Sequence, residues 1–372
     1  MWLVTRHGVG DSSAMHICAY RGYATRTQVF ISGRVLANRW AAALTERESL
    51  WRNLLNTYRQ FETDEVPNVP VVVRFEGQEL TAPTDAEGYY HLELPRIKQS
   101  NETWLTAEAR CKVRGAEVSA THEIVAPTSE AEFGVISDLD DTVIETNMTS
   151  LVTAAKLTFI GNAKTRKPLE GVAALYASLG SGGAGRPVNP IFYVSSSPWN
   201  LYDLLCDFMA LNEIPKGPIF LRDWGIDRTK FIKPRGHRDK LERALKIMGD
   251  FPELPFVLVG DSGQQDAGLY AEAATLHPDR IKAIYIRDVD PATATQRDDH
   301  VRAHIKTAAQ HGVPMLLAPD SQAMAHHAAE LGLILAHKEA EVEVEVAKDQ
   351  ERPDPGGAAL TQALGLESSR AP

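Results

Sequence analysis

The sequence is poor in cysteine and has no long apolar run. Its three cysteines, Cys18, Cys111 and Cys206, are an odd number at wide spacing without a C-x-x-C pair, so they indicate neither a disulfide framework nor a zinc site. No stretch approaches the roughly 18 apolar residues that a membrane-spanning helix requires. We therefore expect a reducing, cytoplasmic setting and a soluble protein that is at most peripheral to a membrane.

The chain also lacks an excess of positive charge. Lys and Arg number 39 against 49 Asp and Glu, a net charge of −10, which argues against unspecific binding to nucleic acid. The segment 216–246 is a local exception, with ten basic and four acidic residues. Such a segment fits contact with an anionic lipid surface, and it fits an ordinary solvated face equally well.

The N-terminal third has the texture of β structure. At 372 residues the chain has room for two domains or slightly more. Residues 1–65 contain an alternating strand pattern around Val29 and a one-sided apolar pattern from Thr45 to Phe61 that predicts a helix. Residues 66–128 contain short alternating runs separated by turn signals, and we expect a small antiparallel β domain there.

Apolar strands and helix-length segments alternate through residues 129–337. This alternation predicts an α/β fold with a parallel, Rossmann-like sheet that helices cover on both faces. The expected strands are Phe133–Ile136, Ile191–Val194, Pro218–Leu221, Phe256–Val259, Ala283–Ile286 and Met315–Leu317. Residues 338–372 contain Glu-Val repeats and a Pro-Gly-rich stretch without a periodic apolar face, and we expect a disordered tail.

Polar residues follow the first of these strands. Asp138 and Asp140 are two positions apart, so in an extended segment their side chains can point to the same side. Ligands of open parallel sheets bind at the carboxyl ends of the strands. Two close carboxylates repel one another unless a cation or a proton lies between them, and both situations serve catalysis. The alternative is an acidic strand end that caps the next helix.

Two other strands end in polar motifs of the same kind. Ser195-Ser196-Ser197 can offer hydroxyls and helix-opening amides to a phosphate oxygen. Asp261 and Asp266 bring two further carboxylates, and Mg²⁺ prefers such hard oxygen ligands. Lys240, which opens a predicted helix between these motifs, can neutralise charge in a phosphoryl-transfer transition state, although taken alone it also fits a solvated helix surface.

The order of these elements resembles a known superfamily. Asp138-x-Asp140-x-Thr142, then Ser195, Lys240 and Asp261 with Asp266, are similar to the four motifs of the haloacid-dehalogenase superfamily of phosphotransferases. The flanking sequences resemble the actin-patch-protein family of Mg²⁺-dependent phosphatidate phosphatases. They are residues 133–143, 192–201, 251–252, 259–263, 20–25 and 33–36. The resemblance therefore reaches beyond the catalytic segment 129–337.

The resemblance implies roles for the catalytic residues. Asp138 is expected to be the nucleophile that forms an aspartyl-phosphate, and Asp140 the acid that protonates the leaving oxygen and then the base that activates water. Lys240 is expected to bind the phosphoryl oxygens and to restrain the nucleophile. Arg238 is the rival for this cation, and we prefer Lys240 because a compact point charge suits the role.

The resemblance also implies contacts to substrate and metal. Thr142 is expected to support the catalytic loop on the substrate side, and Ser195 and Ser196 to contact the substrate phosphate. The metal ligands for Mg²⁺ are expected to be Asp138, Asp140 through its backbone carbonyl, Asp261 and Asp266.

The implied activity is a Mg²⁺-dependent phosphatidate phosphatase that releases phosphate and diacylglycerol. The alternative is a phosphomonoesterase of the same superfamily with another soluble or protein substrate. A receiver domain is disfavoured because its phosphorylated Asp stands apart from the acidic pair, and a cation-pump module because it would lack the carboxylate of Asp140. The short segments between the motifs leave no room for a large cap, which favours a bulky or membrane-presented substrate.

Overall fold

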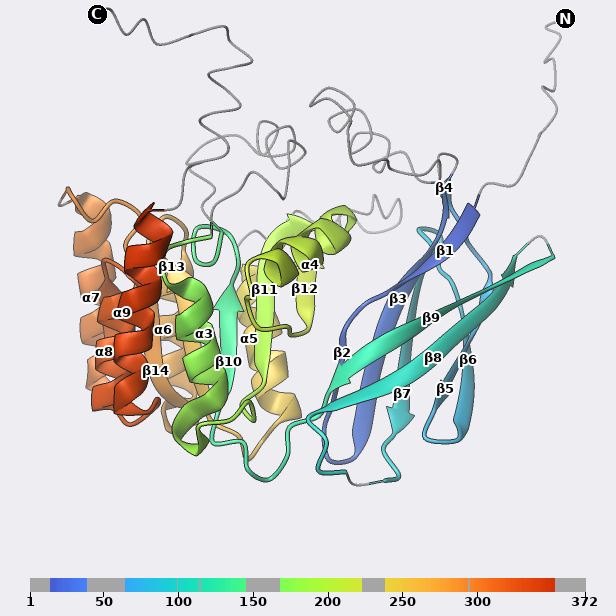
Figure 1. Ribbon diagram of the computed structural model, residues 1–372, viewed down its shortest axis with the longest axis horizontal. Helices are drawn as coiled ribbons and strands as arrows, with labels where there is room; N and C mark the ends of the chain where they lie inside the picture. The colour runs from blue at the N-terminus through green and yellow to red at the C-terminus, as the bar shows by residue number, and fades with distance from the viewer. Residues whose placement is uncertain are drawn as a thin grey trace, which may run out of the picture.

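A computed structural model of the protein describes residues 14–38, 64–98, 100–113, 115–144, 168–222, 238–293 and 295–351. Two β-sheets organise these residues, a nine-stranded sheet in the N-terminal third and a six-stranded parallel sheet after it (Figure 1). The α/β class and the β-rich N-terminal region that the sequence predicts are confirmed. The helix predicted over Thr45–Phe61 lies outside the described residues.

The first sheet joins the two N-terminal segments that the sequence suggested. Strand β3 pairs with β1, β2 and β4, and also with β7, so strands from residues 1–65 and 66–128 share one sheet. The strands are β1 Ala14–Ala19, β2 Gly22–Ala24, β3 Gln28–Asn38, β4 Asp64–Glu65, β5 Pro70–Phe75, β6 Gln78–Pro83, β7 Tyr89–Pro95, β8 Trp104–Val113 and β9 Ala116–Val125.

Strand β8 shows why this region forms a sheet with one buried face, in which all strand pairs but β2 with β9 are antiparallel. Its buried residues are every second one, namely Leu105, Ala107, Ala109, Cys111 and Val113, and the residues between them are exposed or half-buried. Side chains of a strand alternate between faces, so this pattern buries one face only. The buried face contributes to an apolar core that also includes Val71, Phe75 and Leu94.

The second sheet has the strand order β12-β11-β10-β13-β14-β15, with all pairs parallel. All six strands lie where the sequence predicts them. Their bounds are β10 Gly134–Asp138, β11 Ile191–Pro198, β12 Ile219–Arg222, β13 Phe256–Asp261, β14 Ile281–Arg287 and β15 Met315–Ala318. Every residue of β10 and β13 is buried, as expected for central strands covered on both faces.

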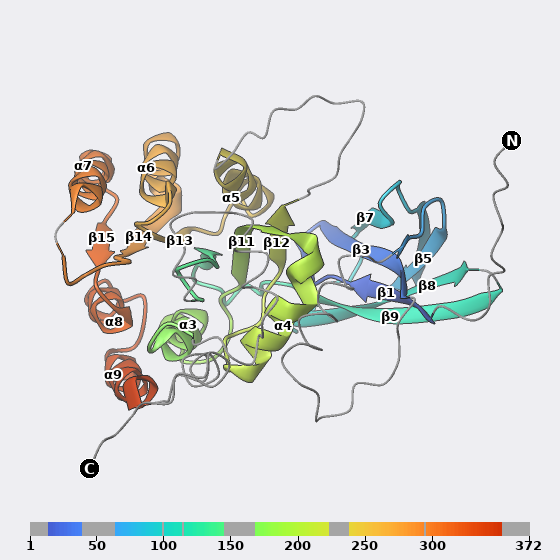
Figure 2. The same cartoon turned by 90° about the horizontal axis from the view of Figure 1, so that it is seen from above.

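Helices cover both faces of this sheet (Figure 2). On one face lie α5 Arg238–Asp250, α6 Asp266–Leu276 and α7 Gln296–Gln310, and on the other lie α3 Val172–Ser181, α4 Tyr202–Leu211, α8 Ser321–Glu330 and α9 Ala336–Glu351. Successive residues of β10 reach the two layers, because Val135 packs with the second set and Ile136 with the first. Short 3₁₀ turns are η2 Gly182–Ala184, η3 Trp199–Leu201 and η4 Pro278–Arg280.

Helix α9 corrects the predicted C-terminal tail. Disorder was expected from residue 338, but residues 338–351 are helical, so this prediction is wrong for them, and residues 352–372 lie outside the described part. Val342 and Val346, four residues apart, lie on one helix face and are buried in the core that α3 and α8 share. The Gly171 N–H donates to Oδ2 of Asp349 at 3.0 Å. Glu and Val alternate with a period of two in this segment, so its apolar residues do not show the spacing typical of a helix.

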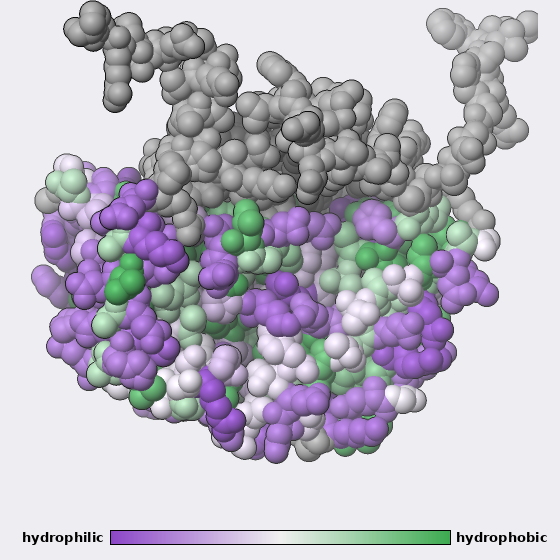
Figure 3. Space-filling model, in the orientation of Figure 1, coloured by the Kyte–Doolittle hydropathy of each residue, from purple (hydrophilic) through white to green (hydrophobic). Residues whose placement is uncertain are grey.

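The first sheet packs against the β12 side of the parallel sheet (Figures 1 and 2). Tyr23 contacts Phe192 and Phe220 edge-on at 6.0 Å, and its hydroxyl donates to Asp250 at 2.6 Å. Lys216 pairs with Glu123 of β9 and lies 4.2 Å from the ring centre of Trp104. Polar and apolar residues alternate in small patches on the face shown in Figure 3. None of the described helices is both long and apolar enough to cross a bilayer.

Candidate active site

The central strands bring the predicted motifs to one edge of the parallel sheet. Asp138 is the last residue of β10, and Asp261 is the last residue of β13. The two strands pair directly, with Ser137 opposite Val259. Parallel strands end on the same side, so both carboxylates come to the edge where ligands of such sheets bind.

Lys240 enters this edge from the first turn of α5. Its Nζ lies 3.0 Å from Oδ1 of Asp138 and 3.1 Å from Oδ1 of Asp266, and its side chain is only 5% exposed. Arg238, the rival cation, has a side chain 66% exposed and pairs with Glu272. The structure thus brings Lys240, and not Arg238, into contact with the carboxylates.

Three buried carboxylates form a possible metal site. Asp138, Asp261 and Asp266 each offer an oxygen within 4.8 Å of the others, and all three residues are buried. Lys240 supplies one positive charge against their three negative charges, so a divalent cation would balance the group. Asp138 Oδ1 contacts Lys240 Nζ at 3.0 Å, and this is its only cationic contact among the described residues. Clustered carboxylate oxygens are the hard ligands that Mg²⁺ prefers.

Gly260 makes the close approach of Asp266 possible. A Cβ at this position would lie 2.7 Å from Cβ and from Oδ2 of Asp266, well inside van der Waals contact. The same Oδ2 accepts the N–H of Asp261 at 3.3 Å. The glycine therefore lets the start of α6 fold against the end of β13, which places Asp266 beside Asp261.

Asp140 binds serines and lies outside the three-carboxylate cluster. Ser195 Oγ donates to Oδ2 of Asp140 at 2.8 Å, and Ser197 Oγ lies 3.3 Å from the same oxygen. Ser196, predicted as a substrate contact, is exposed, and no hydrogen bond joins it to the described site residues. Alternation along β11 explains the difference, because Ser195 and Ser197 share a side. The period-two rule applied to the serine run would have selected Ser197.

A tight turn follows Asp140. Asp141 has a left-handed backbone with φ of 52°, and its N–H donates to the carbonyl of Ile144. The Val143 N–H returns to the carbonyl of Leu139 at 3.0 Å. Thr142 is buried within this turn, 3% exposed. Its Oγ1 has no hydrogen-bond partner among the described residues, so its role in supporting the loop stays a prediction.

Gln264 is a site residue that the sequence reasoning did not single out. Its Nε2 donates to Asp138 Oδ2 at 3.2 Å and to Asp261 Oδ2 at 3.0 Å, and its Oε1 accepts from Lys240 at 3.0 Å. The backbone N–H of Gln264 also donates to Asp261 Oδ1. The available signal was its position in the loop between Asp261 and Asp266, two residues that were predicted to belong to the site.

Burial shifts the ionisation of the site. Burial raises the pKa of Asp138 well above its usual range, with Lys240 opposing the shift. Burial and the neighbouring Asp266 raise the pKa of Asp261 to about 7. Burial also raises the pKa of Asp140, against the hydrogen bond from Ser195. Burial lowers the pKa of Lys240, but Asp138 and Asp266 reverse this effect and keep the amine protonated.

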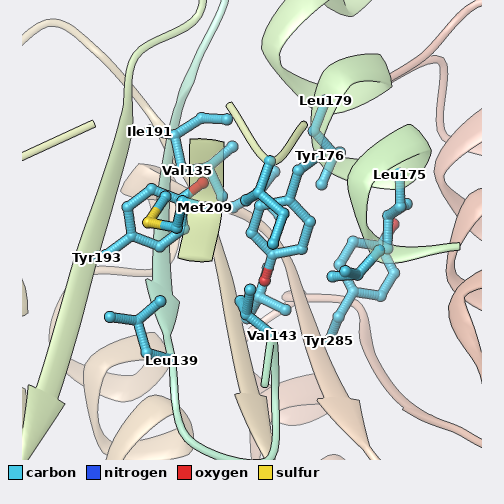
Figure 4. Packing of buried hydrophobic residues seen from close by; sticks show 14 of the residues in the cluster. Val135, Leu139, Val143, Leu175, Tyr176, Leu179, Ile191, Tyr193, Met209 and Tyr285 are labelled. Carbon is cyan, nitrogen blue, oxygen red and sulfur yellow. The ribbon is translucent and has the colours of Figure 1, made fainter. Parts of the chain in front are cut away.

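A buried tyrosine is linked to the backbone of Asp138 through Ser137. Tyr176 of α3 shares a hydrogen bond of 2.5 Å with Ser137 Oγ, and Ser137 Oγ donates to the carbonyl of Asp138 at 2.6 Å. Figure 4 shows Tyr176 among the buried apolar side chains of this core, between Val135 and Val143. The backbone of the nucleophile candidate is therefore tied to a packed core.

In a second group of acidic residues, one member has a structural role. Asp288, Asp290 and Asp298 lie close together beyond β14. Asp298 forms a capping box with Thr295 at the start of α7, accepting its backbone N–H at 2.9 Å. This structural role accounts for the burial of Asp298.

Comparison with known proteins agrees with the motifs. Residues 133–288 match the catalytic-domain family of phosphatidate phosphatase APP1. This part of the chain is therefore similar to that catalytic domain. The resemblance inferred from the motifs is thereby confirmed.

Two curated relatives extend the match beyond the APP1 catalytic domain. Phosphatidate phosphatase APP1 of Saccharomyces cerevisiae is 30% identical over 240 residues, which cover 61% of this chain and 39% of the yeast protein. An uncharacterized protein of Schizosaccharomyces pombe is 29% identical over 223 residues, or 57% of this chain and 35% of its own length. The chain thus spans about two fifths or less of these relatives.

Solved structures are only distantly similar. A carbohydrate acetylesterase from Xanthomonas citri aligns with a TM-score of 0.27 at 12% identity, over 77% of this chain and 72% of the other. A β-glucuronidase from Bacteroides uniformis aligns with a TM-score of 0.26 at 10% identity, over 81% and 38%. Likeness at this level carries no argument about fold or function.

Proposed function

We propose that the protein is a Mg²⁺-dependent phosphatase of haloacid-dehalogenase type that hydrolyses phosphatidate to diacylglycerol and phosphate. The observation that carries the proposal is the buried contact of Lys240 with Asp138 and Asp266, within a domain of the APP1 catalytic family. A buried cation between carboxylates, at the ligand-binding edge of a parallel sheet, suits a transferred phosphoryl group, because that reaction requires positioning and charge neutralisation.

The first half of the reaction uses Asp138 and Asp140. A carboxylate oxygen of Asp138 attacks phosphorus, and the bond from phosphorus to the glycerol oxygen breaks. The proton of Asp140 passes to that leaving oxygen, which frees diacylglycerol and leaves an aspartyl-phosphate. The raised pKa of Asp140 favours the protonated form that this step requires.

The second half returns the enzyme to its starting state. The Asp140 carboxylate takes a proton from water while the water oxygen attacks the phosphorus, so the bond to Asp138 breaks and phosphate leaves. Ser195 and Ser197 hold the Asp140 carboxylate through both steps. Lys240 keeps its proton throughout and offsets the negative charge of the phosphoryl oxygens.

Asp138, Asp261 and Asp266, with the backbone carbonyl of Asp140, would hold Mg²⁺. When bound, the ion supplies positive charge for the phosphoryl oxygens and lowers the repulsion between attacking carboxylate and phosphate. The excess negative charge of the cluster over Lys240 supports a divalent ion at this place.

A soluble phosphomonoester remains the alternative substrate because the described cations of the segment 216–246 have partners within the molecule. Lys216 pairs with Glu123, Lys246 with Asp250 and Arg238 with Glu272, while Arg243 stacks on Phe220. These side chains give little reason to assign a lipid surface. Lys230, Lys233 and Arg235, the residues predicted to contact lipid, lie outside the described residues, as does Arg228.

The test is phosphate release by purified protein from phosphatidate in detergent micelles and from a soluble aryl phosphate. We expect Asp138→Asn to lower turnover by several orders of magnitude on both substrates, because the amide cannot attack phosphorus. Asp239→Asn, an exposed carboxyl-to-amide change in the same turn of α5 as Lys240, is the control and should retain activity. Activity should vanish with a chelator and return with Mg²⁺ better than with Ca²⁺.

The outcomes separate the two substrates. Faster turnover of phosphatidate, falling as salt screens surface charge, supports the lipid assignment. Equal or faster turnover of soluble phosphomonoesters supports the alternative. More than a tenth of wild-type activity in Asp138→Asn contradicts the mechanism for either substrate.

A further inference from the structure

The end of β11 carries the two serines that hold Asp140, yet regular strand pairing skips these serines. Pairing of β11 with β10 ends at Val194, opposite Asp138. Pairing with β12 shifts register after Val194 and is next seen at Pro198, opposite Arg222. Ser195–Ser197 lie in this gap, without regular ladder partners on either side. Their position therefore depends on the contacts that hold the chain immediately after them, from Pro198 onward.

The first sheet holds that chain through Tyr20. The Tyr20 ring stacks on Trp199 with centroids 4.3 Å apart and planes at 24°, and it also contacts Tyr202 at 4.5 Å. Trp199 begins η3 directly after the last residue of β11. Tyr20 is only 3% exposed, so the stack is packed and not a surface contact. Aromatic pairs of this geometry gain energy beyond their buried area.

Tyr20 itself is fixed within the first sheet. Its N–H donates to the carbonyl of Ser32 at 3.2 Å, and its carbonyl is hydrogen bonded to Nδ1 of His122 at 2.9 Å. The next backbone N–H, of Arg21, donates to the Tyr202 hydroxyl at 2.7 Å. The ring therefore projects from an anchored backbone onto the residues that follow the serines.

We propose that Tyr20 is a positioning residue for Asp140: its ring holds Trp199, which sets the place of Ser195 and Ser197 and hence the orientation of the Asp140 carboxylate. The first sheet then completes the catalytic domain and is not a separate binding module. The kinetic consequence rests on the proposed phosphatase activity, whereas the structural consequence for residues 195–203 does not.

The test compares Tyr20→Ala with Tyr20→Phe. We expect the alanine variant to lose about tenfold to a hundredfold in kcat on a soluble aryl phosphate, with KM changed less than threefold, because misplacing an acid-base group affects turnover more than binding. Amide hydrogen exchange in residues 195–203 should become faster. The phenylalanine variant keeps the ring and should restore both properties to within about twofold of wild type.

Leu94→Ala is the control for general destabilisation. Leu94 is fully buried in the core of the same sheet. It belongs to a different core cluster from the one that contains Tyr20 and packs against Trp199. It should lower the free energy of unfolding by about 3 kcal/mol without changing kcat or exchange in residues 195–203 at a temperature where it is folded.

The result that overturns the proposal is unchanged exchange in residues 195–203 of Tyr20→Ala, or equal losses of kcat in Tyr20→Ala and Leu94→Ala. If the wild-type protein hydrolyses no phosphomonoester, the proposed function fails, and the exchange comparison still decides whether Tyr20 holds this segment.

Discussion

Buried polar groups of the two sheets differ in charge and in how far their partners balance them. In the first sheet His122 is fully buried, but it is neutral and partnered on both nitrogens, by the Tyr90 hydroxyl at 2.7 Å and the Tyr20 carbonyl at 2.9 Å. At the edge of the parallel sheet, Lys240 faces three buried carboxylates and balances only one of them.

This difference separates a stabilising region from a reactive one. A satisfied neutral network costs little on burial, whereas uncompensated buried charge costs stability unless a ligand or cation offsets it. The first sheet therefore holds its polar groups in a neutral, satisfied network, and the carboxyl edge of the parallel sheet holds a buried acidic cluster that one lysine offsets in part.

The largest effect is expected for the cation of the reactive region. Lys240→Gln removes the only positive charge that the described residues bring to the three carboxylates, so kcat should fall about a hundredfold to a thousandfold. Arg238→Gln is the control, because that side chain pairs with Glu272 at the surface, and its kcat should stay within about twofold. Steady-state kinetics on one soluble substrate measures both. Similar losses of kcat in the two variants would contradict the assignment of the catalytic cation to Lys240 alone.

The buried histidine should make the first sheet sensitive to acid. Burial lowers the pKa of His122 to about 4. The contribution of neutral His122 to the free energy of unfolding is therefore fully present above about pH 6.5, the approximate pKa of histidine in the unfolded state. This contribution is lost as pH falls toward 4, by about 3 kcal/mol in total. Urea unfolding of wild type and His122→Gln at pH 7 and pH 4.5 tests this. The difference in unfolding free energy between the two proteins should shrink at pH 4.5, and parallel pH dependences would contradict it.

Magnesium should stabilise the reactive region through its carboxylates. Binding to the folded state at a hundredfold excess over Kd raises the free energy of unfolding by about 2.7 kcal/mol. Asp261→Asn should abolish this gain, and without Mg²⁺ it should be at least as stable as wild type because one buried repulsive charge is gone. Asp290→Asn, in the second acidic group, should keep the full gain. Thermal unfolding with and without Mg²⁺ measures each case, and a gain retained by Asp261→Asn would place the ion elsewhere.

The smallest effect concerns the packing of α9 on the parallel-sheet region. Val342 is fully buried and Val344 is 67% exposed on the same helix. Val342→Ala should lower the free energy of unfolding by about 2 kcal/mol, and Val344→Ala by less than about 0.5 kcal/mol. Denaturant unfolding of the two variants provides the comparison. Equal effects would mean that α9 does not pack on the core in solution.

The sequence by itself determined the order of strands and helices and most of the site. Continuous apolar runs such as Phe256–Val259 predict central strands because both faces are buried, and the polar residue after each run marks the ligand edge. Asp138, Asp261 and Asp266 could be placed together on this basis, since parallel strands end on one side. The similarity to the APP1 catalytic domain could also be inferred from these motifs, because their order is specific.

Only the tertiary structure decided the contacts that depend on neighbouring elements. Lys240 and Arg238 are two residues apart on α5, and their sequence cannot tell which faces Asp138, because that depends on how the helix packs. Gln264 donates to Asp261, three residues earlier in the same loop, and to Asp138, which comes from another strand, so this contact depends on how the loop folds. The apolar face of α9 is defined by the packing of Val342 and Val346 in the core with α3 and α8. The stack of Tyr20 on Trp199 likewise joins residues that are far apart in the chain. Local sequence patterns predict which residues are buried, whereas long-range packing determines which residues each of them contacts.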